Sequence, residues 1–370
     1  MKDVIIIGGG LAGLINAILL NRSGLTVQLF EEKKYPFHRV CGEYISNEVL
    51  PFLNQHQLYP AALQPTAITQ FHLSSVSGKS LKMPLDLGGF GVSRYLLDHW
   101  LAEIAINEGV EITHQRVTSS NFNDDIFTIT DKGDQVYNCK IAIGAFGKRS
   151  VLDKNLNRNF IQKRSPYVGV KYHIKTDSVG ADVIALHNFK GGYCGVSQIE
   201  NETFNLCYLS HRSNIKEYGS IQHMEEEVLQ KNPYLKSIFS DSDFLFDKPE
   251  VINEITFEKK EPLYNHILMS GDSAGMITPL CGNGMAMAIH SAKILSELII
   301  KNQQQGFNRT KLENDYSEAW NDLFAKRLSA GRAIQKLFGS QTFSEIAVSA
   351  GKSIKPIAGY LMKQTHGKPF

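Results

Sequence analysis

Cysteine, tryptophan and long apolar runs are scarce in this chain of 370 residues. The five cysteines lie far apart, and no pair has the spacing of a zinc site or a CxxC redox motif. No apolar stretch reaches the length of a membrane span, and the N-terminus lacks the uninterrupted apolar region of a signal peptide. These absences favour a cytoplasmic protein with free thiols at Cys41, Cys139, Cys194, Cys207 and Cys281.

An excess of charge of one sign is also absent. The 39 basic residues balance 37 acidic ones, so the net charge is +2 and nothing supports a nucleic-acid partner. The twelve histidines show no HExxH or similar spacing, and we therefore assign no metal. With 42% hydrophobic residues, a chain of this length favours one large domain or two interleaved ones.

The chain begins with the pattern of a βαβ unit. Residues 4–7 form a β-branched run, typical of a parallel strand covered on both faces, and residues 26–30 form a second strand after an Ala/Leu/Ile-rich helix. Between strand and helix lies GxGxxG, at Gly8, Gly10 and Gly13. Gly8 permits the tight turn, Gly10 lets the backbone approach a pyrophosphate, and Gly13 lets helix and strand pack closely. Glu31 then stands near the spacing expected of an acid that binds ribose hydroxyls, although a purely structural glycine turn is the alternative.

The later elements alternate in type along the chain. A long helix is expected at residues 92–107, strands at 110–114, 126–130 and 135–142, and an antiparallel sheet between about 167 and 209. A buried strand at 267–270 and a helix at 284–300 follow, and the chain has a helical pattern from 311 onward.

A second motif follows the buried strand at 267–270. Asp272 in Gly-Asp-Ser-Ala-Gly (271–275) can accept hydrogen bonds from sugar-like hydroxyls, and capping of the following turn is the alternative. Pro-Leu-Cys-Gly-Asn-Gly (279–284) then opens a helix of small residues. The positive end of that helix dipole would stabilise negative charge on an electron-rich ring.

These two motifs, with Arg94 in Val-Ser-Arg-Tyr-Leu-Leu (92–97) between them, resemble the para-hydroxybenzoate hydroxylase-type flavoprotein superfamily. That superfamily includes FAD monooxygenases, flavin-dependent halogenases and geranylgeranyl reductases, and the resemblance covers nearly the whole chain. It implies that Glu31 binds the adenosine ribose, that Arg94 lies near the ribityl-phosphate region and that Asp272 binds the ribityl chain or pyrophosphate. The cofactor-contacting set expected from it is Gly8, Gly10, Leu11, Ala12, Gly13, Glu31, Glu32, Arg39, Cys41, Gly42, Arg94, Gly147, Asp272, Pro279, Gly282, Asn283, Gly284 and Met285.

The segment Arg-Val-Cys-Gly-Glu (39–43) resembles the Cys-Gly segment of the geranylgeranyl reductase branch, which lies close to the flavin. Arg39 is a candidate pyrophosphate partner. Cys41 is a candidate redox or positioning residue, with a buried structural cysteine as the alternative. Glu43 is a candidate proton donor beside the flavin, with a solvated loop acid as the alternative.

Three departures from the superfamily limit the chemistry. Phe146 stands where NADPH-using monooxygenases carry an aspartate before Gly147, which argues against tight NADPH binding. The tryptophan motif of the halogenases is absent. The Tyr-x-Trp-x-Phe-Pro strand of the reductase branch keeps only its tyrosine, Tyr193, so a long isoprenoid tunnel is not supported. Tyr193 is a candidate general acid because a phenol with a pKa of about 10 is protonated at neutral pH, and a packed sheet tyrosine is the alternative.

We therefore expect an α/β fold with an α+β insert: a Rossmann-type FAD-binding domain, a mainly antiparallel substrate domain and a C-terminal helical segment. The expected FAD-binding domain comprises residues 1–75, 92–165 and 260–310, the substrate domain 76–91 and 166–259, and the helical segment 311–370. That last segment is expected to pack as a cap, with peripheral membrane contact as the alternative.

The expected activity is monooxygenation of a small apolar substrate through a flavin C4a-hydroperoxide, with NADH or NADPH as a candidate transient reductant. Reduction of a double bond, as in the geranylgeranyl reductases, is the first alternative. A binding module without FAD, as in the Rab-escort family, is the second.

Overall fold

The N-terminal βαβ unit forms the centre of the first of two sheets. The computed structural model describes residues 1–370 except 164, 254, 279–281, 339–344, 346–347 and 349–366. Strand β1 lies between β2 and β9 and is parallel to both, and its last four residues are buried. The order is β16-β17-β9-β1-β2-β6, with β8 joining β7 to β9. These strands are β1 (Lys2–Ile7), β2 (Val27–Phe30), β6 (Glu111–Thr113), β7 (Val117–Asn123), β8 (Ile126–Asp131), β9 (Val136–Gly144), β16 (Leu263–Tyr264) and β17 (Ile267–Met269).

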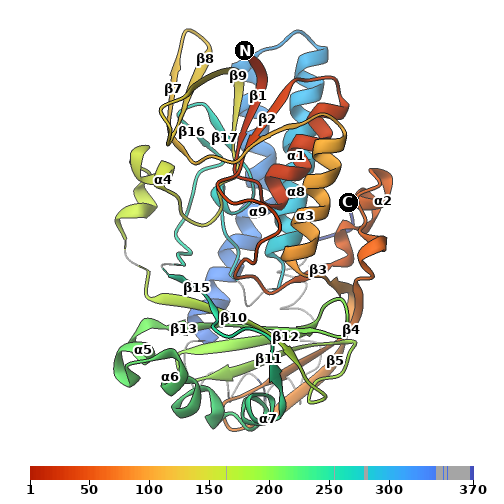
Figure 1. The fold of residues 1–370 in the computed structure, drawn as a ribbon, viewed down its shortest axis with the longest axis vertical. Helices are drawn as coiled ribbons and strands as arrows, with labels where there is room; N and C mark the ends of the chain where they lie inside the picture. The colour runs from red at the N-terminus through yellow and green to blue at the C-terminus, as the bar shows by residue number, and fades with distance from the viewer. Residues whose placement is uncertain (164, 254, 279–281, 339–344, 346–347, 349–366) are drawn as a thin grey trace.

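Long helices pack beside this first sheet (Figure 1). Helix α1 (Leu11–Arg22) contacts both α3 (Arg94–Asn107) and α8 (Gly284–Gln304), and α9 (Arg309–Phe338) packs on α8. The first ten residues of α1 are all buried, as expected of a helix enclosed by other elements. Helix α3 begins where Ser93 Oγ accepts a hydrogen bond from the Leu96 backbone N–H, 3.2 Å away. The helices predicted at residues 92–107 and 284–300 and the helical segment after 311 are thus confirmed over the described residues.

The second sheet contains the strands predicted between residues 167 and 209. Its order is β14-β10-β13-β12-β11-β4-β5-β3, and β15 pairs with β10. Strands β10 to β13 pair antiparallel, whereas β4 and β11 pair parallel. The strands are β3 (Tyr44–Ser46), β4 (Thr66–Ser74), β5 (Ser80–Gly91), β10 (Tyr167–Lys175), β11 (Val183–Phe189), β12 (Gly192–Gln198), β13 (Phe204–His211), β14 (Asp243–Phe244) and β15 (Glu250–Asn253).

Alternation along these strands gives the second sheet two different faces. Val168, Val170, Tyr172 and Ile174 of β10 share a hydrophobic core with residues of α6 and α7. Figure 1 shows α5 (Arg212–Tyr218), α6 (Ile221–Glu227) and α7 (Pro233–Asp241) below this sheet and the first sheet above it. The other face of the second sheet therefore looks toward the first sheet.

The expected boundary at residue 75 does not match the strand pairing. Strands β3 and β4 belong to the second sheet, although residues 1–75 were assigned to the FAD-binding domain. Strand β4 pairs with β11, more than 100 residues later, and local sequence patterns carry no signal of such a pairing. The remaining short elements are η1 (Asn47–Val49), α2 (Leu50–Gln55), η2 (Ala61–Leu63), α4 (Val151–Asn155), η3 (Asn159–Gln162), η4 (Leu229–Lys231) and η5 (Gly271–Ser273).

Candidate functional site

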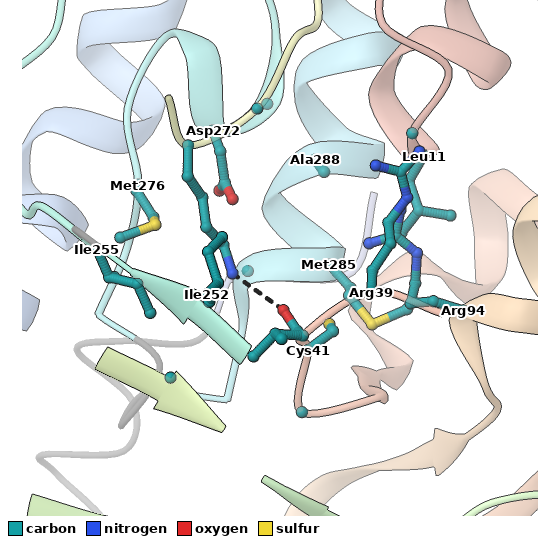
Figure 2. Close-up of a pocket in the computed structure, with 18 of the residues that line it drawn as sticks. Leu11, Arg39, Cys41, Arg94, Ile252, Ile255, Asp272, Met276, Met285 and Ala288 are labelled. Atoms are coloured by element: carbon teal, nitrogen blue, oxygen red, sulfur yellow. Dashed lines mark hydrogen bonds between the residues drawn. The ribbon is translucent and has the colours of Figure 1, made fainter. Parts of the chain in front are cut away.

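A cavity of about 880 Å³ is lined by residues of both sheets. Glu31, at the end of β2, and Asp272, after β17, both line it, although they are 241 residues apart in sequence. Figure 2 shows Arg39 and Arg94 near Leu11 on one side, and Asp272 and Met276 on the other, with α8 between. Of the expected cofactor residues, those that line the cavity are Gly8, Gly10, Leu11, Ala12, Glu31, Glu32, Arg39, Cys41, Gly42, Arg94, Gly147, Asp272, Gly282, Asn283, Gly284 and Met285.

The glycine-rich turn requires glycine at two positions. Gly8 has φ +108°, and a Cβ there would lie 2.3 Å from the Ala145 carbonyl oxygen. A Cβ on Gly13 would lie 1.9 Å from the Gly8 carbonyl oxygen. Gly13 does not line the cavity, so its role is the close packing of α1 on β1. Gly10 is the N-cap of α1 and provides no capping side chain, which leaves the first N–H groups of the helix for an anion.

Two arginines lie beside this turn and share one carboxylate. Asp98 accepts hydrogen bonds from Arg94, at 2.6 and 2.7 Å, and from Arg39 Nε at 3.0 Å. Burial alone would lower the pKa of Arg94, but Asp98 raises it above its ordinary value. A Cβ on Gly10 would lie 3.3 Å from Arg94 Nη2, so the guanidinium adjoins the anion-binding turn. Our sequence reasoning missed Asp98, whose signal is its i, i+4 spacing from Arg94 on a helix.

Glu31 is held at the end of β2 by backbone and side-chain donors. Its Oε2 accepts hydrogen bonds from the Gly9 N–H at 3.1 Å and from Arg39 Nη2 at 2.9 Å, and its Oε1 accepts from the Lys33 N–H at 3.1 Å. These contacts fix the carboxylate at the cavity wall, where the ribose role implied by the resemblance would require it.

The cavity also extends to Arg116, which the sequence motifs did not predict. Arg116 pairs with Glu32 through two hydrogen bonds of 2.8 and 2.5 Å, and this pairing raises the pKa of Arg116. Gln115 and Val117 line the same part. They follow β6, whose end lies beside β2, and loops at the carboxyl ends of parallel strands commonly bind ligands.

The Asp272 segment is fixed by a buried lysine and a hydroxyl. Lys260 donates to the backbone oxygens of Asp272 and Lys148, each at 2.8 Å, and burial lowers its pKa to about 8. Ser273 Oγ accepts from the Gly147 N–H at 2.8 Å, which ties the two loops together. No local pattern indicates Lys260, because it contacts the motif only through tertiary structure.

The residues that open α8 also line the cavity. Asn283 is buried and donates to Glu48 Oε2 at 3.2 Å, and Glu48 in turn accepts from Arg327 at 3.1 Å. Gly282, Gly284 and Met285 lie next to it at the start of the helix. Pro279 and Cys281 lie outside the described residues.

Glu43 differs from both expectations for it. It is fully buried and accepts hydrogen bonds from Lys171 Nζ at 2.5 Å, from His173 Nε2 at 2.8 Å and from the Arg94 N–H at 2.8 Å. Burial alone would raise its pKa, but Lys171 and His173 lower it to about 2. The expectation of a solvated loop acid is therefore wrong, and a carboxylate that stays ionised does not suit a proton donor. Lys171 and His173 are far away in sequence, so their partnership with Glu43 had no local signal.

Cys41 and Tyr193 both line the cavity. Cys41 is a half-buried free thiol in the segment before β3, and Asn205 Nδ2 donates to its carbonyl oxygen at 3.1 Å. Tyr193 lies in β12 and is 4% exposed. The roles predicted for the two side chains remain predictions.

Neither metal ligation nor membrane crossing finds support in the part of the chain that the structure describes. There, no group of three or more histidine, cysteine, aspartate or glutamate side chains could hold a metal ion. Over the same residues, no helix combines the length and apolar character that a membrane span requires.

Residues 1–319 match a protein family described as FAD binding domain. The chain is 22% identical to digeranylgeranylglycerophospholipid reductase 2 of Methanopyrus kandleri, over 93% of this chain and 88% of that protein. It is 24% identical to 3-hydroxybenzoate 6-hydroxylase of Klebsiella oxytoca, over 80% of this chain and 79% of that protein. Among solved structures, it resembles a geranylgeranyl bacteriochlorophyll reductase-like protein from Thermoplasma acidophilum with a TM-score of 0.76 and 16% identity, over 94% of this chain and 90% of that one.

Proposed function

The chain belongs to the FAD binding domain family and is an FAD-dependent oxidoreductase, and from that premise we propose that it is a monooxygenase of small apolar, unsaturated molecules. The described residues fit FAD. An uncapped α1 N-terminus and an adjoining Arg94 suit the pyrophosphate, and the carboxylates of Glu31 and Asp272 suit the hydroxyls of the ribose and ribityl chain. When bound, FAD supplies the reducing electrons and the activation of dioxygen.

The observation that carries this proposal is the state of Glu43. Reduction of a carbon–carbon double bond requires a proton for the carbon that does not receive the hydride, and an acid beside the flavin could supply it. Glu43 follows the Cys41–Gly42 segment directly, but Lys171 and His173 hold it as a carboxylate. Oxygen transfer to an apolar carbon makes a different demand on the protein, which is to position the substrate and exclude water. The apolar residues on the substrate side of the cavity, including Phe71, Leu186 and Ile255, suit that task.

Double-bond reduction is the second candidate, and Cys41 favours it. Its thiol lines the cavity and could donate the proton that Glu43 cannot. A relative named as a digeranylgeranylglycerophospholipid reductase, which aligns over 93% of this chain, is consistent with that chemistry. The monooxygenase and reductase proposals therefore differ in one group, the thiol of Cys41, and in one co-substrate, dioxygen.

Oxygen consumption during turnover separates the two candidates. The holoprotein is supplied with NADPH and either 2-naphthol or geranylgeraniol, with and without oxygen. Monooxygenation consumes one dioxygen and one NADPH for each product, gives the product one oxygen atom and releases the other as water. We expect product to form only when oxygen is present. We also expect the Cys41→Ala variant to keep this oxygen-dependent turnover, as the matched control variant Cys139→Ala should. Equal turnover without oxygen, lost in Cys41→Ala alone, would establish the reductase instead.

A further inference from the structure

The cavity face of the second sheet has an opening at one position. Strand register places Leu186 of β11, Gly195 of β12 and Cys207 of β13 side by side across three strands. Gly195 is partly buried, whereas all the remaining residues of β12 are buried. Within β13, Cys207 is partly buried and its neighbours on both sides are buried. All three residues line the cavity. These two partly buried positions of β12 and β13 therefore adjoin, and both line the cavity.

Gly195 differs from neighbouring glycines in what surrounds it. A Cβ on Gly169 would lie 2.8 Å from Ile255 Cδ1, and one on Gly192 would lie 2.1 Å from the Leu209 carbonyl oxygen. Close packing thus explains these two glycines. A Cβ on Gly195 would meet only the Cys207 carbonyl oxygen, at 3.6 Å, and Gly195 has no positive φ. Neither packing nor backbone conformation requires a glycine there, so its effect is to leave the space above it empty.

The segment around Cys41 packs against β10 and β13 beside this space. The Cys41 carbonyl oxygen is tied to β13 by Asn205 at 3.1 Å, and Lys171 Nζ contacts the Arg39 carbonyl oxygen at 3.2 Å. Burial, and after it the neighbouring Cys41, raises the pKa of Cys207 to about 12, so its thiol stays neutral. The cavity wall below Asp272 in Figure 2 is apolar and includes Ile252, Ile255 and Met276. The space over Gly195 thus has apolar residues on one side, and the charged Lys148, Lys171 and Glu43 lie near enough to Cys207 to shift its pKa.

We propose that Gly195 is a specificity-determining residue, and that the planar, unsaturated part of the substrate lies over it between Leu186 and Cys207. Adjacent strands are about 4.8 Å apart, so the missing side chain leaves a slot one side chain wide. A flat ring fits such a slot, whereas a saturated ring of the same skeleton is thicker. This inference rests on the proposed function, because it assigns the substrate class to the same cavity.

Binding of matched probes to the FAD-loaded protein tests the slot. The probes are 2-naphthol and decahydro-2-naphthol, which share a skeleton and differ in planarity, and the readout is the absorbance of the bound flavin during titration. We expect the unmodified protein to bind 2-naphthol more tightly than its saturated counterpart. Gly195→Ala should weaken 2-naphthol binding about threefold and Gly195→Trp at least about tenfold, because each fills more of the slot.

The control variant is Asn138→Trp, which adds the same bulk at an exposed strand position outside the cavity. It should bind 2-naphthol as the unmodified protein does. Equal affinity of Gly195→Trp and the unmodified protein for 2-naphthol would overturn the inference, and so would a failure of the unmodified protein to bind it. If Gly195→Trp does not fold, Gly195→Ala decides, and unchanged or tighter binding by that variant counts against the slot. These binding results are independent of oxygen consumption, so the proposed reaction can fail while the slot stands.

Discussion

The two halves of the cavity are built in different ways. On the cofactor side, the glycine turn, Arg39, Arg94 and Glu31 are joined by hydrogen bonds to one another or to Asp98. On the substrate side, Phe71, Leu186 and Gly195 come from three strands and offer shape rather than charge. Phosphates and sugars require partners at fixed positions, whereas an apolar ligand requires a cavity of suitable form. The cofactor half is therefore constrained residue by residue, whereas the substrate half is constrained by its shape.

The halves are joined at Glu43. This residue lies between the Cys41–Gly42 segment and β3, and its partners Lys171 and His173 project from β10 of the second sheet. Lys171 is fully buried, as is Glu43. The comparison can be tested first at this junction, then within the cofactor half, and finally at the loop where Phe146 replaces an aspartate.

Replacing Glu43 should have the largest effect. Glu43→Gln leaves the buried ammonium of Lys171 without a carboxylate, which we expect to cost about 3–5 kcal/mol in the free energy of unfolding. Urea denaturation of the FAD-loaded protein measures it. The control is Glu111→Gln, which removes an exposed pair with Lys2 and should cost less than about 1 kcal/mol. A cost below 1 kcal/mol for Glu43→Gln would show that the two halves are not held together by this ion pair.

The same carboxylate predicts a pH dependence. The pKa of Glu43 is lowered from its ordinary 4.5 to about 2, so the folded state binds fewer protons at this site than the unfolded state between these values. The stability that Glu43 contributes is therefore fully present above about pH 4.5 and is lost as the pH falls toward 2. Glu43→Gln should flatten the stability profile in that window, and an unchanged slope there would contradict the lowered pKa.

Replacing Arg94 should act on the cofactor half alone. Arg94→Met removes a partly buried cation beside Gly10 and should raise the dissociation constant of FAD about ten- to hundredfold, the range expected for one charge-assisted hydrogen bond. Fluorescence titration of the FAD-free protein with FAD measures the change. Arg22→Met, which removes an exposed pair with Glu108, is the matched control and should leave the dissociation constant unchanged. An equal effect of the two variants would remove Arg94 from the pyrophosphate site.

The smallest expected effect concerns the choice of reductant. Phe146 lines the cavity and packs near Gly144, where the resemblance led us to expect an aspartate that helps to hold the nicotinamide nucleotide. We expect NADH and NADPH to reduce the bound flavin slowly in the absence of substrate, at rates within about threefold of each other, a difference below 1 kcal/mol. Stopped-flow absorbance measures both rates. Fast reduction selective for NADPH would show that Phe146 does not weaken nucleotide binding.

Site residues could be predicted from the sequence only where the residues that interact lie close together along the chain. Gly8, Gly10, Gly13 and Glu31 lie within one βαβ unit, so their spacing alone identified the turn and the acid at the strand end. Asp98 lies one helical turn from Arg94 and could have been found by the same reasoning. The same reasoning could not have found Lys171, His173 or Lys260, because each contacts its partner only once segments distant in sequence have come together in the fold.

The first βαβ unit and the dinucleotide turn could be predicted from the sequence, because they follow from local periodicity and short-range spacing, whereas FAD as the cofactor was implied by the resemblance of the motifs to a known superfamily. Tertiary structure alone decided that β3 and β4 join the second sheet, that Glu43 is a buried anion and that the space over Gly195 is open. Burial, ionisation and empty volume depend on which distant segments pack around a residue, and a single sequence does not display that packing.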